Sequence, residues 1–132
     1  MRAVLADTGP LYALVDPDDQ YHERAKADLE TLRGERLTLM TSWSILSEAY
    51  TLVLRGLGIP KAQSWLDELI QGIDLITPSE ADYLEAAQRL RPYSDQDISL
   101  FDATLSILSD QLEIPIWTFD HHFDDMRTRV WR

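Results

Sequence analysis

The 132-residue sequence contains no cysteine, which excludes disulfide bonds, thiolate metal sites and a cysteine nucleophile. The same absence favours a reducing compartment. Long apolar runs are also missing, because the N-terminal apolar segment ends at Asp7. A signal peptide needs a longer segment, and a membrane span needs about 20 residues. We therefore expect a cytoplasmic protein with no membrane segment.

Basic residues are scarce. Lys and Arg total 12 against 23 Asp and Glu, which gives a formal net charge of −11. Proteins that bind nucleic acids are usually basic, so the charge alone argues against a large RNA or DNA footprint. It suits a basic protein partner, or a site in which several carboxylates hold cations. The length and the 45% hydrophobic content predict one folded domain over residues 1–132.

Short apolar segments alternate with amphipathic ones along the chain. We expect strands at residues 2–6, 37–40, 73–76 and 114–119, and a fifth at 130–131. Helices are expected at residues 11–15, 19–33, 42–55, 60–72, 79–91 and 99–112. The alternation predicts an α/β fold with a mainly parallel sheet of four to five strands. Ligands of such sheets bind beyond the carboxyl ends of the strands.

Four acidic residues lie after predicted strands, on an apolar helix face or near a helix N-terminus. Asp7 and Asp120 follow the first and fourth predicted strands, so they would converge at one sheet edge and repel each other unless a cation or proton intervened. Glu48 falls on the apolar stripe of its helix, where an ion pair with an Arg is slightly favoured over a metal ligand. Asp102 follows Ser99 by three residues, and a helix-capping role is the simpler interpretation.

A divalent cation suits two converging carboxylates. Mg²⁺ takes oxygen ligands and keeps several waters, so few carboxylates suffice to hold it. Such an ion can activate a water and neutralise charge on a scissile phosphate.

Four short motifs resemble those of the PIN-domain family, in the family's order. Residues 5–14 resemble its N-terminal signature, and residues 47–49 its second acidic motif. Residues 98–103 and 118–123 resemble the third and fourth motifs. Each motif alone is unspecific, whereas the ordered set spans nearly the whole chain.

The resemblance implies a three-layer α/β/α fold, with residues 1–132 as a single PIN-like nuclease domain. It makes Asp7, Glu48, Asp102 and Asp120 the catalytic acids, three of which (Asp7, Asp102 and Asp120) would hold Mg²⁺ or Mn²⁺. Thr118 would supply a hydroxyl near the pocket. Small members of the family resemble VapC-type toxins. The resemblance therefore implies a metal-dependent endoribonuclease acting on RNA, a homodimer, and a small antitoxin protein with basic residues.

The sequence fits other classes of protein less well than a metal-dependent nuclease. A catalytically weak or inactive PIN-like interaction module is disfavoured because all four expected acids are present. A haloacid-dehalogenase-type phosphatase needs Asp-x-Asp after the first strand, but Asp7 is followed by Thr8 and Gly9. A P-loop is absent. A receiver domain needs a late lysine, yet the only lysines are Lys26 and Lys61.

The histidines and one further acid leave alternatives open. Adjacent His121 and His122 are expected to point in different directions, so zinc is disfavoured. One of them is a candidate for a contact with substrate phosphate, although a surface position is favoured. Asp97 is an alternative third acid, although the motif favours Asp102.

The arginines and tryptophans near the motifs have simple structural interpretations. Arg127, Arg129 and Arg132 are expected to balance Asp124 and Asp125 rather than to bind phosphate. The tryptophans are expected in the core or at an interface, and the two on neighbouring helices, Trp43 and Trp65, are candidates for a dimer face.

Overall fold

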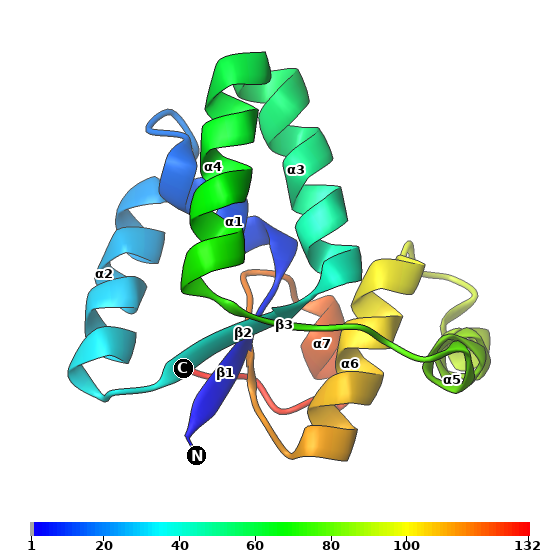
Figure 1. The fold of residues 1–132 in the computed structure, drawn as a ribbon. Helices are drawn as coiled ribbons and strands as arrows, with labels where there is room; N and C mark the ends of the chain where they lie inside the picture. The colour runs from blue at the N-terminus through cyan, green and yellow to red at the C-terminus, as the bar shows by residue number, and fades with distance from the viewer. Residues whose placement is uncertain (1) are drawn as a thin grey trace.

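A computed structural model describes residues 2–132 and shows one parallel sheet surrounded by helices (Figure 1). The sheet order is β3-β2-β1-β4. The strands are β1 (Ala3–Ala6), β2 (Thr38–Ser42), β3 (Asp74–Ile76) and β4 (Ile116–Trp117). All four residues of β1 are apolar and buried, as expected for a central strand that is covered on both faces.

Helices fill the connections between the strands. They are α1 (Thr8–Val15), α2 (His22–Gly34), α3 (Trp43–Leu57), α4 (Ile59–Gly72), α5 (Glu80–Leu90), α6 (Leu100–Leu112) and α7 (His122–Asp125). One 3₁₀ turn, η1 (Arg91–Tyr93), follows α5. None of the helices in residues 2–132 is long and apolar enough to cross a membrane.

The direction of the crossovers sorts the helices into two layers. From β1 to β2 and from β2 to β3 the chain moves the same way across the sheet, so right-handed crossovers place α1 to α4 on one face. From β3 the chain returns past β1 to β4, which places α5 and α6 on the opposite face. Figure 1 shows these two groups with the sheet between them. The predicted three-layer α/β/α fold is confirmed.

Local sequence signals fix several helix starts. Ser42, Ser79 and Ser99 each accept a hydrogen bond, at 3.1 Å, from the backbone N–H three residues later. A serine cap of this kind stabilises a helix by about 1 kcal/mol. Ser79 and Ser99 were expected as caps, and Thr41 or Ser42 was expected to cap α3; the structure confirms Ser79 and Ser99 and shows that Ser42 is the cap of α3.

The expected fifth strand is wrong. Val130 forms a single parallel bridge to Ile116. The Ile116 N–H donates to the Arg129 carbonyl, and the Trp131 N–H donates back to the Ile116 carbonyl, each at 2.9 Å. Because β4 is only two residues long, it offers no further partner groups for a ladder.

The helices also differ from expectation: α1 begins at Thr8 rather than at Leu11. The expected cap Asp19 instead accepts a hydrogen bond from the Tyr21 N–H at 2.9 Å, within a turn, so α2 begins at His22. The short helix α7 has no amphipathic period and was not predicted.

Several apolar residues expected in the core lie at the surface. Ile70 and Leu112 are each 44% exposed, and Phe101 is 39% exposed. Leu112 and Phe101 lie near the two ends of α6, beyond its buried central stretch. Trp65 is buried in the core, which removes it from the expected dimer face, whereas Trp43 is exposed.

Candidate functional site

The candidate site lies where the carboxyl ends of β1 and β4 meet. The two strands are neighbours, and the crossovers reverse direction between them. Parallel sheets bind ligands at such a switch point. A cleft of about 590 Å³ opens there, and its lining includes all four predicted acids: Asp7, Glu48, Asp102 and Asp120. Asp97 is exposed and does not line this cleft.

Asp7 is the most deeply buried acid of the site, with 4% of its surface exposed. It directly follows β1 and caps α1, and its Oδ1 accepts a hydrogen bond from the Thr8 N–H at 2.8 Å. Burial raises the pKa of Asp7 from 3.8 to about 6. Hydrogen bonds from Thr118 and Thr8 oppose this rise, and the charges of Asp120 and Glu48 add to it.

Thr118 connects the two strand ends. Its hydroxyl donates to Asp7 Oδ2 at 2.8 Å and accepts a hydrogen bond from the Asp120 N–H at 2.9 Å. The side chain is buried. Thr118 therefore fixes the orientation of the Asp7 carboxylate and the path of the chain into Asp120.

Asp102 enters the cleft from the first turn of α6. Its backbone N–H is capped by Ser99, so the capping function belongs to the serine side chain. The pKa of Asp102 is raised to about 8, mainly by burial and also by the negative charges of Asp7, Asp120 and Glu48, while the Ser99 hydroxyl opposes the rise. Two neighbouring acids thus resist ionisation for the same two reasons.

Glu48 reaches the cleft from α3. Its Oε1 accepts a hydrogen bond from the Thr8 hydroxyl. The expected ion pair with an arginine is not what holds it, since no Lys or Arg is among the described residues that line the cleft. Glu48 is held instead by a neutral donor next to Asp7.

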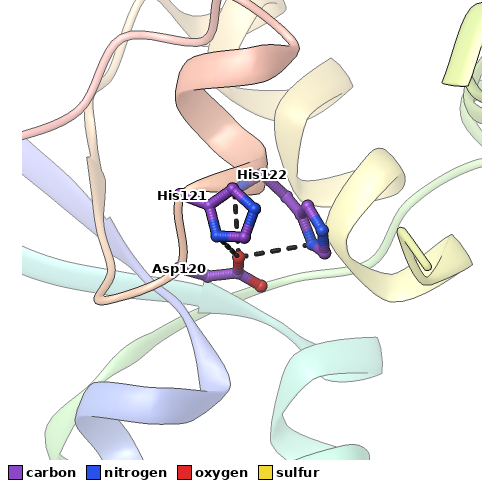
Figure 2. A group of neighbouring side chains, drawn as sticks. All are labelled: Asp120, His121 and His122. Atoms are coloured by element: carbon purple, nitrogen blue, oxygen red, sulfur yellow. Dashed lines mark hydrogen bonds and ion pairs between the residues drawn. The ribbon is translucent and has the colours of Figure 1, made fainter. Parts of the chain in front are cut away.

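Asp120 is surrounded by the two histidines (Figure 2). Its Oδ1 accepts a hydrogen bond from the backbone N–H of His122 at 2.9 Å. The same oxygen lies 3.3 Å from the ring nitrogen His122 Nδ1 and 3.8 Å from His121 Nδ1. The ring centroids of the histidines are 4.5 Å apart. The expectation that they diverge is therefore wrong, because the turn into α7 brings both rings back towards the Asp120 carboxylate.

The side chains around Asp120 offer ligand atoms for a divalent cation. One oxygen or nitrogen from each of Asp120, His121 and His122 lies within 4.8 Å of the others. Among the described residues, His122 Nδ1 is buried without a hydrogen-bond partner. The carboxylate oxygens of the cleft suit Mg²⁺ or Mn²⁺, whereas the two imidazoles beside Asp120 suit transition metals. A bound cation would also relieve the repulsion that raises the pKa of Asp7 and Asp102.

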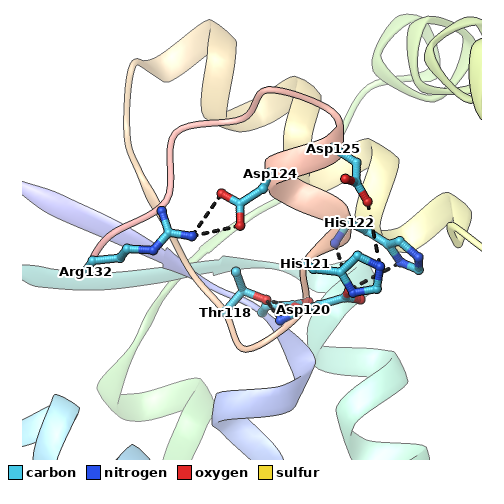
Figure 3. Close-up of polar contacts among 8 residues, drawn as sticks. Thr118, Asp120, His121, His122, Asp124, Asp125 and Arg132 are labelled. Carbon is cyan, nitrogen blue, oxygen red and sulfur yellow. Dashed lines mark hydrogen bonds and ion pairs between the residues drawn. The ribbon is translucent and has the colours of Figure 1, made fainter.

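The C-terminal arginines partly follow expectation (Figure 3). One Arg132 nitrogen donates to both Asp124 oxygens, at 2.7 and 2.9 Å. Arg129 donates instead to the Glu113 carbonyl at 3.4 Å. Asp125 Oδ2 lies 3.7 Å from His121 Nε2.

Sequence reasoning missed several residues of the cleft wall, among them Asp19, Tyr21 and Phe119. Asp19 adds a fifth acid, and the rings of Tyr21 and Phe119 stack with their centroids 4.7 Å apart. The acid-rich stretch before α2 was a signal for Asp19. The aromatic pair joins residues far apart in the chain, so local sequence carried no sign of it.

Comparisons with known proteins agree with this geometry. The family model described as PIN domain matches residues 4–128. A search of curated proteins gave no significant match.

Solved structures share the fold at low identity. VapC20 of Mycobacterium tuberculosis, described as a sarcin-ricin loop cleaving toxin, aligns with a TM-score of 0.81 and 22% identity over 93% of this chain and 94% of that one. VapBC2 of Rickettsia felis, bound to a promoter DNA fragment, aligns with a TM-score of 0.74 and 16% identity over 98% and 97% of the two chains. FitAcB of Neisseria gonorrhoeae aligns with a TM-score of 0.72 and 20% identity over 98% of this chain and 96% of that one.

The TM-scores show a shared fold, and the family model adds a sequence match along nearly the whole chain. The chain belongs to the PIN domain family.

Proposed function

We propose that this protein is a metal-dependent endoribonuclease and the toxin of a toxin–antitoxin pair. The observation that carries the proposal is the convergence of Asp7, Glu48, Asp102 and Asp120 on one cleft at the switch point of the sheet. Acids in such a cleft whose pKa is raised by burial and by one another are typical of functional sites.

Three of the acids would hold the cation. In this proposal Asp7, Asp102 and Asp120 hold Mg²⁺ or Mn²⁺, and Glu48 completes the site. When bound, a divalent cation supplies positive charge to the scissile phosphate and lowers the pKa of a bound water.

The chain's own residues prepare these acids. Thr118 and the Thr8 N–H hold the two oxygens of Asp7, each at 2.8 Å. The Thr8 hydroxyl holds Glu48, and the turn into α7 holds Asp120. Fixed carboxylates reduce the reorganisation that cation and substrate binding would otherwise require.

The proposed RNA substrate and antitoxin partner are inferred from similarity to VapC-type toxins. The structurally similar VapC20 is described as a sarcin-ricin loop cleaving toxin, and the VapC-type toxins that this chain resembles are held in check by an antitoxin. The net charge of −11 suits a small partner with basic residues. A homodimer belongs to the same proposal, with exposed Trp43 rather than buried Trp65 available for its interface.

A cleavage assay tests the proposal. We expect the purified protein to cut RNA in Mg²⁺ or Mn²⁺ and to lose the activity in chelator. Asp7→Asn should lower the rate at least about 100-fold, because it removes a charged ligand. Asp97→Asn is the matched control, since Asp97 is exposed outside the cleft, and it should cut like wild type.

Two results would defeat the proposal. One is an Asp7→Asn protein that cuts RNA at the wild-type rate. The other is wild-type cleavage that survives complete removal of divalent cations.

A further inference from the structure

The wall of the cleft poses a problem for binding RNA. Its described lining includes five acids and no Lys or Arg. A cation at the acids would serve the scissile phosphate, but the flanking nucleotides need contacts of their own. The following inference rests on the proposed ribonuclease function and concerns where those contacts lie.

A second, smaller hollow adjoins the cleft. It measures about 200 Å³ and shares Phe119, Asp120 and His121 with the cleft. The two arginines Arg24 and Arg132 line it. The residues 119–121 therefore form a ridge, with acids on one side and two arginines on the other.

Both arginines keep donors available. The Arg24 side chain is 60% exposed, and its Nε lies 4.0 Å from Asp28 Oδ2. Arg132 is 67% exposed and uses a single nitrogen for Asp124 (Figure 3). A guanidinium carries five N–H donors, so most remain free for a phosphate. Asp120 and Asp124 also line this hollow and reduce its positive charge.

An aromatic surface spans the ridge. Tyr21 stacks on Phe119 at an interplanar angle of 27°, and the Arg24 guanidinium carbon lies 4.7 Å from the Phe119 ring centroid. Tyr21 lines the cleft and is 36% exposed. An accessible ring beside the acids can stack with an unpaired base, since every base presents a π-face.

We propose that Tyr21, Phe119, Arg24 and Arg132 form a subsite for a nucleotide of single-stranded RNA next to the cleaved bond. A base stacks on Tyr21, and the phosphate that crosses the ridge binds Arg24 and Arg132. The pairing of one aromatic surface with two arginines selects unpaired RNA, because a base inside a duplex cannot reach the ring.

The number of arginines sets the expected salt dependence. Each phosphate contact with single-stranded nucleic acid contributes about −0.7 to the slope of log K against log salt. Two contacts give a slope of about −1.4, and the loss of either arginine lowers its magnitude by about 0.7.

Binding of a labelled eight-nucleotide single-stranded RNA, followed by fluorescence anisotropy in Mg²⁺, tests the subsite. The Asp7→Asn protein is used so that the RNA stays intact. In this background we expect Tyr21→Leu to weaken binding roughly tenfold through lost stacking. Arg24→Met and Arg132→Met should each weaken binding several-fold at low salt and reduce the salt slope as above.

Lys26→Met is the matched control. Lys26 lies on α2 with Arg24, and its side chain is 56% exposed, but it lies outside both hollows. It should change the affinity less than about twofold. Melting temperatures of all variants check that α2 stays folded, since a purely structural stack would lower stability and leave affinity unchanged.

The outcomes separate this subsite from the proposed function. If wild type cuts no RNA but the variants rank as expected, the nuclease proposal fails and the subsite stands. If wild type cuts RNA while Tyr21→Leu and Arg24→Met bind like Lys26→Met, the subsite is wrong. Equal affinity for a duplex, or no binding to Asp7→Asn at low salt, would also overturn it.

Discussion

Asp7 lies buried beneath the cleft, where its carboxylate is costly to ionise. Burial raises its pKa from 3.8 to about 6. That difference corresponds to about 3 kcal/mol of free energy lost from the folded state when the acid is ionised. Asp7 thus lowers stability for the sake of the site, a common conflict between stability and function.

Asp7→Asn should therefore raise the melting temperature of the metal-free protein at pH 7.5. The amide has no charge to desolvate, and it can still accept the Thr8 N–H at the place of Oδ1. Thermal unfolding in chelator checks this, and an increase of several degrees is expected. A clear decrease would mean that Asp7 is mainly structural.

Thr118 is predicted to matter through its hydroxyl alone. Thr118→Val removes the donor to Asp7 Oδ2 and the acceptor of the Asp120 N–H. Unfolding in urea should show a loss of about 1–3 kcal/mol, because one oxygen of a buried carboxylate is left without a donor. The pKa of Asp7 should rise above 6 for the same reason.

Thr118→Ser is the control for that substitution. It retains the hydroxyl and should keep most of the stability and of the RNA cleavage. Equal loss in the Ser and Val variants would assign the effect to packing of the methyl group instead.

At the scale of helices and strands, features that depend on adjacent residues were predicted correctly from the sequence. Contacts between different elements were not. Ser42, Ser79 and Ser99 were predictable as caps, because a cap depends on a few adjacent residues. Trp65 is buried as its helical period predicts, whereas the exposure of Ile70 depends on how α4 packs on its neighbours. A helical period shows which residues share a face, but not how wide a stripe the neighbouring element covers.

Two helical glycines should respond oppositely to alanine. A Cβ at Gly56 in α3 would lie 2.5 Å from the Tyr12 hydroxyl oxygen, which donates to Asp16 at 2.7 Å. A Cβ at Gly34, the last residue of α2, meets nothing within 4 Å. Neither glycine has a positive φ angle.

Gly34→Ala should stabilise the protein by about 0.4–1 kcal/mol, since alanine restricts the unfolded chain. Gly56→Ala should destabilise the protein despite the same restriction of the unfolded chain, because the Tyr12 hydroxyl must give up its hydrogen bond to Asp16 to make room for the Cβ. Equilibrium unfolding in urea measures both. Equal stabilisation by the two changes would show that Tyr12 moves without cost.

For the whole molecule, the acids of the cleft set a pH dependence. Asp7 and Asp102 have folded pKa values raised from 3.8 to about 6 and about 8. Each group therefore favours folding fully below pH 3.8, and this contribution is lost as the pH rises through its folded pKa. The acids with lowered pKa, Asp16 and Asp82, act in the opposite direction at low pH.

Metal-free protein should accordingly lose stability between pH 5 and 8, as measured by urea unfolding in chelator. The double variant Asp7→Asn/Asp102→Asn should show a much flatter profile over the same range. An unchanged slope in the double variant would assign the pH dependence to groups outside the cleft.

The fold class and two of the acids, Asp7 and Asp120, were predictable from local patterns, whereas Glu48 and Asp102 were predicted as site residues only through the resemblance to the PIN-domain family. Alternating strands and helices specify a parallel sheet, and acids after two strands meet at one edge. The contact of Tyr21 and Arg24 with Phe119 was not predictable, since it depends on how α2 lies beside the end of β4. The same holds for the histidines, which the turn into α7 brings back to Asp120.

The central claim is that the converging acids form one cation site, and a Mn²⁺ titration followed by thermal unfolding tests it most directly. Wild type and Asp97→Asn should show saturable stabilisation, by about 2.7 kcal/mol at one hundred times the dissociation constant. Asp7→Asn and Asp102→Asn should lose most of it. No Mn²⁺-dependent stabilisation of wild type, or equal stabilisation of all four proteins, would contradict the account.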